Sequence, residues 1–452
     1  MTKPIFKFLS YITPTWYFNL KPEIDHGYFP TRQQVGNVPQ RFLEDNRYVS
    51  PEAAESDLAW RMFQAGYINR TKAEAGKNIW ETGKLPIEDE YRFVRKNFHP
   101  FWAVYVLLLR LLSFHNPLAE LRGFLKTRKV TRSAEPPIAY PEYEPFNSPL
   151  VQSRPLVSVI IPTLNRYPWL NDVLNDLTNQ TYQQIEVIVV DQSEPFQEAF
   201  YQNRQLNIRV WYQKEKALWK ARNDAIRAAN GNLILLYDDD SRIEPDWILH
   251  HLKALDFFNA DISSGVSISQ VGARVPAHYS HFRWSEQLDT GNVLIKRQVF
   301  EKIGLFDRQF EKQRMGDGEF GLRAYLAGFR NVSNPYAKRI HLKVGEGGLR
   351  QMGSWDGWRP KSWFAPRPVP SVLYLTRSYF DNKQAFFVIA MNLIPSLIPY
   401  KLKGKKIFLV FTPFLFVLLF PILAFQVSLA WRRSSKMMKV GPIIESLNTE
   451  YR

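Results

Sequence analysis

An uninterrupted apolar run ends in three consecutive aspartates, and this junction constrains the fold of the chain more than any other feature. Residues 233–237 read Leu-Ile-Leu-Leu-Tyr, and Asp238, Asp239 and Asp240 follow directly. A short run that is apolar at every position is typical of a strand buried on both faces of a parallel sheet. Such strands carry ligand-binding residues at their carboxyl ends. The junction therefore predicts a binding site at the end of a buried strand.

The three adjacent carboxylates indicate that other groups neutralise them. Like charges at this spacing repel one another, so a fold keeps such a cluster most readily beside a cation or beside hydrogen-bond donors. Oxygen ligands select hard cations such as Mg2+ or Mn2+, which usually arrive with phosphate groups. A solvated aspartate turn after a core strand is the alternative that the junction alone leaves open.

Strands and helices alternate around this junction. This alternation predicts an α/β unit with a mainly parallel central sheet. The other predicted strands are residues 156–161, 185–190 and 208–212, and the predicted helices are residues 167–178, 216–230 and 247–259.

Composition and charge narrow the functional class. The 452 residues include no cysteine, which excludes disulfides, zinc–thiolate sites and thiol catalysis. The net charge of +16 is uneven: residues 1–154 hold 21 basic and 16 acidic side chains, residues 155–337 hold 20 and 22, and residues 338–452 hold 18 and 5. A nucleic-acid enzyme would spread basic charge over its catalytic groove. Because the excess lies beside the most apolar segment, we expect a membrane surface, and no nucleic acid, as a partner.

The chain is long enough for several parts. Residues 101–114 form an apolar run broken by Arg110, too short to span a bilayer, which fits a buried or an interfacial helix. Ser50 and Pro51 mark the start of a helix. The expected segments are a helix-rich N-terminal region of unknown role (1–134), a proline-rich linker (135–155), the α/β domain (156–348), an aromatic and basic connecting segment (349–384) and a basic, apolar, membrane-associated tail (385–452).

The tail contains no acidic residue from 382 to 444. Of its two apolar runs, 385–400 and 407–431, the second is long enough to span a bilayer, although Pro413 and Pro421 would kink it. Both flanks of this run are basic, so charge gives no clear orientation. A single span, a re-entrant hairpin, an interfacial pair of helices and a buried hairpin of a soluble protein all remain open.

Four motifs in order resemble those of family 2 glycosyltransferases, which have the GT-A nucleotide-sugar-binding fold. The resemblance covers residues 157 to about 348, and four elements in the right order and spacing make it specific. They are residues 157–166 (VSVIIPTLNR), residues 187–193 (VIVVDQS), residues 221–225 (ARNDA) running into the aspartate cluster, and residues 316–323 (GDGEFGLR).

The resemblance implies a donor site and a metal site. Asp240 would ligate a divalent cation, Mn2+ or Mg2+, and Asp238 would hold the ribose or a metal-bound water. His341 stands where some relatives carry a third metal ligand, although a satisfied surface or core histidine is an equal reading. The residues implied in donor binding are Pro162, Thr163, Asn165, Asp191, Arg222, Asp238 and Asp239.

Two of these residues have a plain structural alternative. Asp191 would bond to the nucleotide base or its sugar, and could instead cap the turn before Pro195. Arg222 would lie near the diphosphate as a cation with a planar fork of donors, and could instead be a solvated charge on its helix.

The general base implied by the resemblance is Asp317, which would take the proton of the acceptor hydroxyl. The family usually has an acidic residue just before this aspartate, whereas this chain has Gly316. Glu319 is therefore kept as the substitute base, and capping of the following helix is the structural alternative for Asp317.

Two further features have a possible part in the site. Residues 345–348 have the glycine content of a mobile lid over the donor. Trp355, Trp358 and Trp363 could stack on sugars, but beside a membrane segment they serve equally as interfacial anchors, which we favour.

Together these features predict a membrane-associated, inverting, metal-dependent glycosyltransferase at the cytoplasmic face. It would move one sugar from a nucleotide-sugar donor to a hydroxyl of a glycan or lipid-linked acceptor. Transfer of a single sugar is favoured because the Gln-x-x-Arg-Trp pattern of processive synthases is absent from the sequence. The alternatives are a sugar nucleotidyltransferase, which would need a glycine-rich basic loop after the first strand, and a non-catalytic nucleotide-sugar-binding or scaffold protein, for which Gly316 is the only hint.

Overall fold

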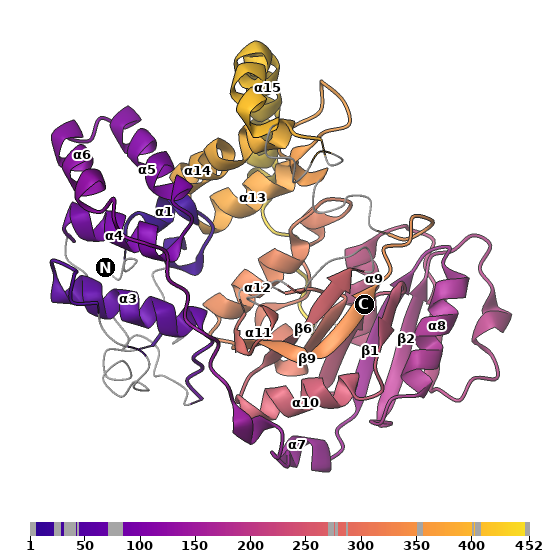
Figure 1. Cartoon of the computed structure of the whole chain (residues 1–452). Helices are drawn as coiled ribbons and strands as arrows, with labels where there is room; N and C mark the ends of the chain where they lie inside the picture. Colours follow the sequence, from indigo (N-terminus) through magenta and orange to yellow (C-terminus); the bar gives the residue numbers. More distant parts are fainter. Residues whose placement is uncertain are drawn as a thin grey trace. The chain divides into compact units, whose positions relative to one another are not determined.

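The chain divides into two compact units in the computed structural model (Figure 1). Unit 1 comprises Met1–Ile138 and Thr376–Leu393, and unit 2 comprises Ala139–Leu375 and Ile394–Arg452. The structure describes residues 6–21, 29–30, 42, 45–70, 85–269, 275, 279–285, 288–349, 356–399, 402 and 408–447.

Unit 1 is helical, as predicted for the N-terminal region. The predicted start of one helix is confirmed, because the Ser50 hydroxyl accepts a hydrogen bond from the Ala53 amide (3.3 Å) and Pro51 takes the first helical position. Residues 376–393 also belong to this unit, and nothing in the sequence pattern predicts this. The helices are α1 (Leu9–Ile12), α3 (Pro51–Gln64), α4 (Ile87–Asn97), α5 (Phe101–Leu112), α6 (Pro117–Lys126) and α14 (Asn382–Leu393), and α13 (Pro370–Tyr379) ends in it.

Stacked aromatic rings and one buried ionic network form the core of unit 1. Phe6 stacks on Phe93 with ring centroids 3.8 Å apart, and Trp60 meets Phe93 edge-on. The fully buried Asp57 accepts hydrogen bonds from Lys96 (2.6 Å) and Arg61 (3.0 Å). Since an unpaired buried carboxylate would be strongly destabilising, these two cations are what allow Asp57 to lie in the core.

Unit 2 is built around one mixed sheet of nine strands: β1 (Val157–Thr163), β2 (Ile185–Asp191), β3 (Ile208–Tyr212), β4 (Leu233–Tyr237), β5 (Ser241–Ile243), β6 (Ile262–Ser269), β7 (Arg283–Trp284), β8 (Asn292–Lys296) and β9 (Asn331–His341). Their order is β3-β2-β1-β4-β8-β6-β9-β5, and β7 pairs with β9. Strands β1 to β4, β6 and β9 share one direction, whereas β5, β7 and β8 run against it. The predicted α/β class with a mainly parallel sheet is confirmed.

The register of the sheet brings the predicted site residues to one edge. Strands β1, β2 and β4 are buried at every position, which explains their unbroken apolar runs. Thr163 pairs with Asp191, and in the register of β1 with β4 it comes level with Asp239. His341 ends β9 opposite Ser241, directly after the aspartate cluster. The ends of β1, β2, β4 and β9 therefore build one site.

Helices cover both the parallel and the mixed part of the sheet. Helix α9 packs on β1 and β2, and α10 packs on β6 and β9 (Figure 1). Buried Asn292 on β8 accepts hydrogen bonds from Trp247 (2.9 Å) and pairs with His251 (3.0 Å), which ties α10 to the middle of the sheet. The remaining helices of unit 2 before the tail are α7 (Pro149–Gln152), α8 (Tyr167–Thr178), α9 (Leu218–Ala228), α10 (Trp247–Phe257), α11 (Arg297–Ile303) and α12 (Gly316–Leu326).

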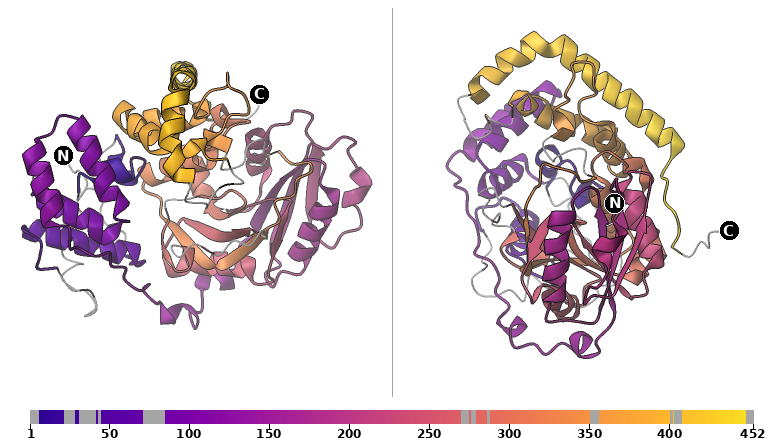
Figure 2. Two further views of the ribbon diagram at one scale, coloured as in Figure 1. Left: turned by 45° about the horizontal axis from the view of Figure 1, so that its top comes forward. Right: turned by 90° about the vertical axis from the view of Figure 1, so that its right-hand side faces the viewer.

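The tail forms one long helix, α15 (Phe408–Val440), which continues through Pro413 and Pro421 (Figure 2). Among the described residues, Phe411–Val440 is the one helix that is long and apolar enough to cross a membrane, judged by length and composition only. The other predicted apolar run, 385–400, forms α14 and a short 3-10 turn, Pro395–Leu397.

One face of α15 packs along unit 2. Leu423, Gln426, Ala430 and Ser434 are buried on this face, and Gln426 accepts a hydrogen bond from the Arg367 guanidinium (3.0 Å). The segment after α15 is also held, since the Leu305 amide donates to the carbonyl of Glu445 (2.9 Å) and the Ile443 amide donates to Asp307 (2.9 Å). The helix and its C-terminal extension are therefore part of the folded unit.

The stability of the chain should depend on the protonation of Glu90. This buried side chain on α4 accepts hydrogen bonds from the amides of Lys7 (2.9 Å) and Phe8 (3.0 Å), and burial raises its pKa to about 7 in spite of them. The unfolded carboxyl titrates near 4.5. Between these values the folded state binds the extra proton, so the free energy of unfolding falls as pH rises through this window, by about 3 kcal/mol.

Denaturant unfolding at pH 5 and pH 8 measures this effect, with Glu90→Gln as the matched control because it cannot ionise. We expect the wild-type protein to lose about 2.5 kcal/mol more than the variant between these two pH values. An equal loss in both proteins would show that Glu90 does not titrate in this window.

Candidate active site

Hydrogen-bond donors surround Asp239 at the end of β4. The Thr163 hydroxyl donates to one of its oxygens (2.8 Å) and the Arg166 guanidinium to the other (2.8 Å). The same guanidinium lies 3.1 Å from Asp240. Burial raises the pKa of Asp239 to about 6, and Asp240 adds to this effect while Arg166 and Thr163 oppose it. Asp239 thus points toward β1, and its carboxyl group is engaged by the protein.

Asp238 lies between two buried arginines. Arg222 on α9 donates to its Oδ1 (2.9 Å) and to the carbonyl of Thr290 (3.0 Å), and Arg339 on β9 donates to its Oδ2 (2.9 Å). A Cβ atom at residue 291 would collide with both Asp238 and Arg339, so Gly291 leaves the room that this pairing needs. Arg222 is therefore a buried partner of Asp238 and not a solvated charge on its helix.

Arg339 is itself held by a second acidic group. Its guanidinium donates to Asp289 (3.0 Å), to the Ser267 hydroxyl (2.7 Å) and to the Ser241 hydroxyl (2.8 Å). Burial lowers the pKa of Arg339, but Asp289 and Asp238 outweigh it and leave that pKa raised. The side chain remains a cation and fixes the orientation of Asp238.

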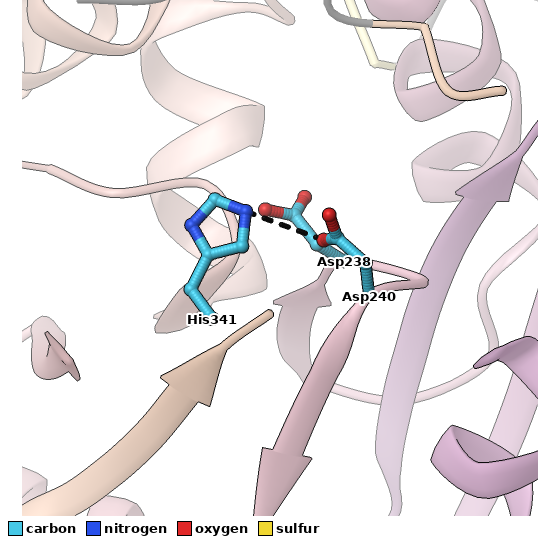
Figure 3. Close-up of side chains that lie close together, drawn as sticks. All are labelled: Asp238, Asp240 and His341. Carbon is cyan, nitrogen blue, oxygen red and sulfur yellow. Dashed lines mark ion pairs between the residues drawn. The ribbon is translucent and has the colours of Figure 1, made fainter. Parts of the chain in front are cut away.

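Asp238, Asp240 and His341 offer ligand atoms within 4.8 Å of one another (Figure 3). His341 Nε2 lies 3.3 Å from Asp240 Oδ1. Two carboxylates and one imidazole suit a divalent cation such as Mn2+ or Mg2+. Because both oxygens of Asp238 already accept hydrogen bonds from arginines, Asp240 and His341 are the side chains better placed to bind such an ion. The structure thus brings together the three residues predicted from the sequence as metal ligands.

Asp191 ends β2 with both oxygens occupied. Tyr167 and Tyr201 donate their hydroxyl protons to Oδ2 (2.7 and 2.8 Å), and the Ser193 amide donates to Oδ1 (2.8 Å). The hydrogen bond from the Ser193 amide is the turn cap that was predicted as the alternative role of Asp191. Asn165 adjoins it, since its amide donates to the Ser193 hydroxyl (2.7 Å). These residues, with buried Pro162 on β1, form the wall of the site on the β2 side.

Asp317 is half-buried in the first turn of α12, where a negative charge also favours the helix dipole. It lines a cleft together with Arg222 and Thr290. Glu319 is instead buried and forms a two-pronged ion pair with Arg323 (2.6 and 3.0 Å). Of the two carboxyl groups predicted as the base, only Asp317 lines this cleft, which also contains the arginine that binds Asp238.

The glycine before Asp317 has a packing reason. A Cβ atom at residue 316 would lie 2.5 Å from the indole ring of Trp219, which fills this space. The Trp219 indole N–H donates to the carbonyl of Phe310 (3.1 Å), so the ring is fixed there. Residue 316 is therefore glycine, in place of the acidic residue usual in the family, because the ring of Trp219 on α9 leaves no room for a side chain.

The glycine-rich segment predicted as a lid contacts the turn after β1. The Gly348 amide donates to the carbonyl of Leu164 (2.8 Å), and Arg166 donates to the carbonyls of Val344 and Glu346 (both 2.9 Å). Arg166 therefore joins this segment to Asp239. Trp363 is exposed and adjoins α15, whereas Trp355 lies outside the described residues.

Three site residues were not singled out from the sequence: Arg166, Arg339 and Asp289. Arg166 closes the first motif, and its position in the turn between β1 and α8 was a usable signal. Arg339 stands two residues before His341, and side chains two apart on a strand share a face. Asp289 has no sequence signal, because its pairing with Arg339 joins segments that are far apart in the chain.

The family model described as glycosyl transferase family 2 matches residues 158–317. The glycosyltransferase GlyA of Streptococcus pneumoniae serotype 4 is 26% identical over 166 residues, or 35% of this chain and 22% of that protein. The putative glycosyltransferase EpsH of Bacillus subtilis is 28% identical over 213 residues, or 42% of this chain and 62% of that protein.

Among solved structures, S. aureus TarS 1–349 in complex with UDP-GlcNAc matches with 20% identity and a TM-score of 0.40, over 49% of this chain and 65% of that chain. The matched part of this chain spans less than two thirds of GlyA and EpsH. The family match covers the second and third sequence motifs, all of the first except Val157, and the aspartate cluster, and it ends at Asp317 within the fourth motif. Residues 158–317 of the chain thus match glycosyltransferase family 2.

Proposed function

We propose that the protein is an inverting glycosyltransferase that moves one sugar from a nucleotide-sugar donor to a hydroxyl of a glycan or lipid-linked acceptor. The observation that carries this proposal is the placement of Asp238, Asp240 and His341 at the sheet edge, with Asp317 in the cleft that Arg222 also lines. A cation site for a diphosphate and a separate carboxylate for an acceptor hydroxyl are what such a transfer needs.

In this proposal Asp240 and His341 hold the divalent cation, Mn2+ or Mg2+. When bound, the cation neutralises the charge of the donor diphosphate and of the leaving group. Arg222 and Arg339 fix the orientation of Asp238, which would hold the donor ribose or a metal-bound water. Thr163 and Arg166 hold Asp239, so the middle carboxylate shapes the site from the β1 side.

Asp317 acts as the general base of the proposed reaction. Its half-buried carboxylate takes the proton of the acceptor hydroxyl while that oxygen forms a bond to the anomeric carbon. The bond from the anomeric carbon to the diphosphate oxygen breaks on the opposite face, so the anomeric configuration inverts without a covalent enzyme intermediate. Glu319 is unsuited to this role because Arg323 already binds both of its oxygens.

We further propose that α15 attaches the enzyme to the cytoplasmic face of a membrane and lies in the membrane surface. The outer side of its N-terminal half exposes large apolar side chains, including Phe414, Val417 and Leu418. Its other side packs along unit 2 from Leu415 to Gln426, through Arg367 and the turn at Pro395–Leu397. A helix held along its length by its own domain fits an interfacial position better than a span.

Replacing the proposed base should abolish transfer and leave the fold intact. For Asp317→Asn we expect transfer to fall by a factor of about 10²–10⁴, the usual contribution of a general base, with donor binding and the thermal midpoint unchanged. The matched variant Glu319→Gln should instead destabilise the protein by roughly 3–5 kcal/mol, because it breaks a buried ion pair. Turnover assays and thermal unfolding of both variants test this, and normal transfer by Asp317→Asn would remove Asp317 from the mechanism.

The proposed metal site can be tested without turnover. Asp240→Asn and His341→Ala should each weaken Mn2+ binding, measured by calorimetry on the metal alone, by at least about tenfold. Asp172→Asn, a half-exposed carboxylate on α8, is the matched control and should bind Mn2+ as the wild type does. Unchanged binding in both site variants would show that the cation binds elsewhere.

If α15 attaches the protein to a membrane, polar substitutions on its exposed apolar side should weaken the binding of the protein to lipid vesicles. Phe414→Ser, Val417→Ser and Leu418→Ser should each lower vesicle partitioning by about tenfold, since burying such a side chain stabilises by roughly 1.5–3 kcal/mol. Val440→Ser, also exposed but at the basic end of α15, is the control and should change little. Co-sedimentation of full-length protein with vesicles measures this, and equal partitioning of all variants would contradict the proposal.

A further inference from the structure

Helices α5 and α6 of unit 1 form a hairpin that exposes an apolar surface. Phe101, Val104, Leu108 and Leu112 are all exposed on α5. Their spacing of three or four residues places them on one face of that helix. Soluble proteins rarely expose a contiguous apolar stripe of this kind without a partner.

The turn and the second helix continue this surface. Phe114 in the turn is 97% exposed, and Leu118 at the start of α6 is 79% exposed. Leu121 and Leu125 follow at helical spacing and are exposed as well. Helices α5 and α6 pack against each other, so the two stripes belong to one hairpin (Figure 1).

One buried ion pair anchors the hairpin to the rest of unit 1. Glu120 is buried and pairs with Arg110 (2.6 Å), and it accepts a hydrogen bond from the Tyr91 hydroxyl of α4 (2.8 Å). Ala103 and Val106, on the opposite side of α5, are buried in unit 1. The hairpin is therefore firmly folded, and its apolar outer surface is a property of the fold and not of a frayed end.

The exposed charges of residues 101–134 have one sign, although Lys126 pairs with Glu88 of α4 (2.9 Å). Residues 101–134 contain one acidic residue, the buried Glu120. The same stretch exposes basic side chains on α6 and just after it: Arg122, Lys126, Arg128, Lys129 and Arg132. Apolar side chains flanked by cations are typical of a segment that binds the surface of an anionic bilayer. Helix α5, with 12 residues, is too short to span one.

We propose that the α5–α6 hairpin docks on an anionic lipid bilayer, with Phe114 and Leu118 at the boundary between headgroups and acyl chains. The cations then contact the lipid phosphates. This gives the N-terminal region a role that the proposed sugar transfer does not supply. It rests on different residues from the proposed attachment through α15, so either surface can fail without the other.

A fluorescent label tests the hairpin in the full-length protein. Since the chain has no cysteine, Phe114→Cys takes a single environment-sensitive label, and Glu52→Cys, at an exposed position in the first turn of α3, serves as the matched control in the same unit. With vesicles of phosphatidylcholine and phosphatidylglycerol, we expect a blue shift at position 114 and quenching by brominated acyl chains. Position 52 should show neither. Because the label reports its own surroundings, attachment by α15 alone cannot produce this result.

The charge dependence completes the test. Arg128→Gln and Lys129→Gln, made in the labelled Phe114→Cys protein, should each weaken insertion of the label roughly fivefold, and vesicles of phosphatidylcholine alone should give little insertion. A label at position 114 that stays water-exposed on vesicle-bound protein would overturn the proposal. A blue shift without vesicles that grows with protein concentration would also overturn it, because it would assign the surface to a second copy of the chain.

Discussion

The site depends on the neutralisation of one carboxylate, that of Asp238. Each of its oxygens accepts a hydrogen bond from a buried guanidinium, one from Arg222 on α9 and one from Arg339 on β9. An unpaired charge at this depth would strongly destabilise the folded state. Asp238, Arg222 and Arg339 are therefore stable in these positions only when all three side chains are present and paired. Their pairing joins the ends of β4 and β9, and this places Asp240 and His341 close enough to share a cation.

The parts of this site that follow from local sequence were predictable. Buried strands leave continuous apolar runs, so the ends of β1, β2 and β4 could be located to within a residue or two. Parallel strands end at one edge of a sheet, which is why Thr163 and the aspartate cluster, both implied in donor binding by the family resemblance, lie together. The cap of α3 at Ser50 was likewise readable, since capping involves only neighbouring residues.

The remaining features arise from contacts between distant parts of the chain. The insertion of β8 between β4 and β6 reverses the sheet locally, and nothing in residues 292–296 distinguishes an antiparallel strand from a parallel one. The pairing of Arg339 with Asp289 and the packing of Trp219 on Gly316 join segments that pattern and propensity cannot relate. Gly316 illustrates the consequence: read alone it hinted at lost chemistry, whereas in the fold it accommodates a tryptophan.

The most direct test of the account is a panel of nucleotide sugars incubated with the full-length protein and Mn2+, followed by release of nucleoside diphosphate. Slow hydrolysis of the donor by water reports donor choice before any acceptor is known. We predict release from one donor, abolished by a chelator and restored by added Mn2+. Release of pyrophosphate, or no metal-dependent binding of any nucleotide in the panel, would contradict the assignment of the sheet-edge site to sugar transfer.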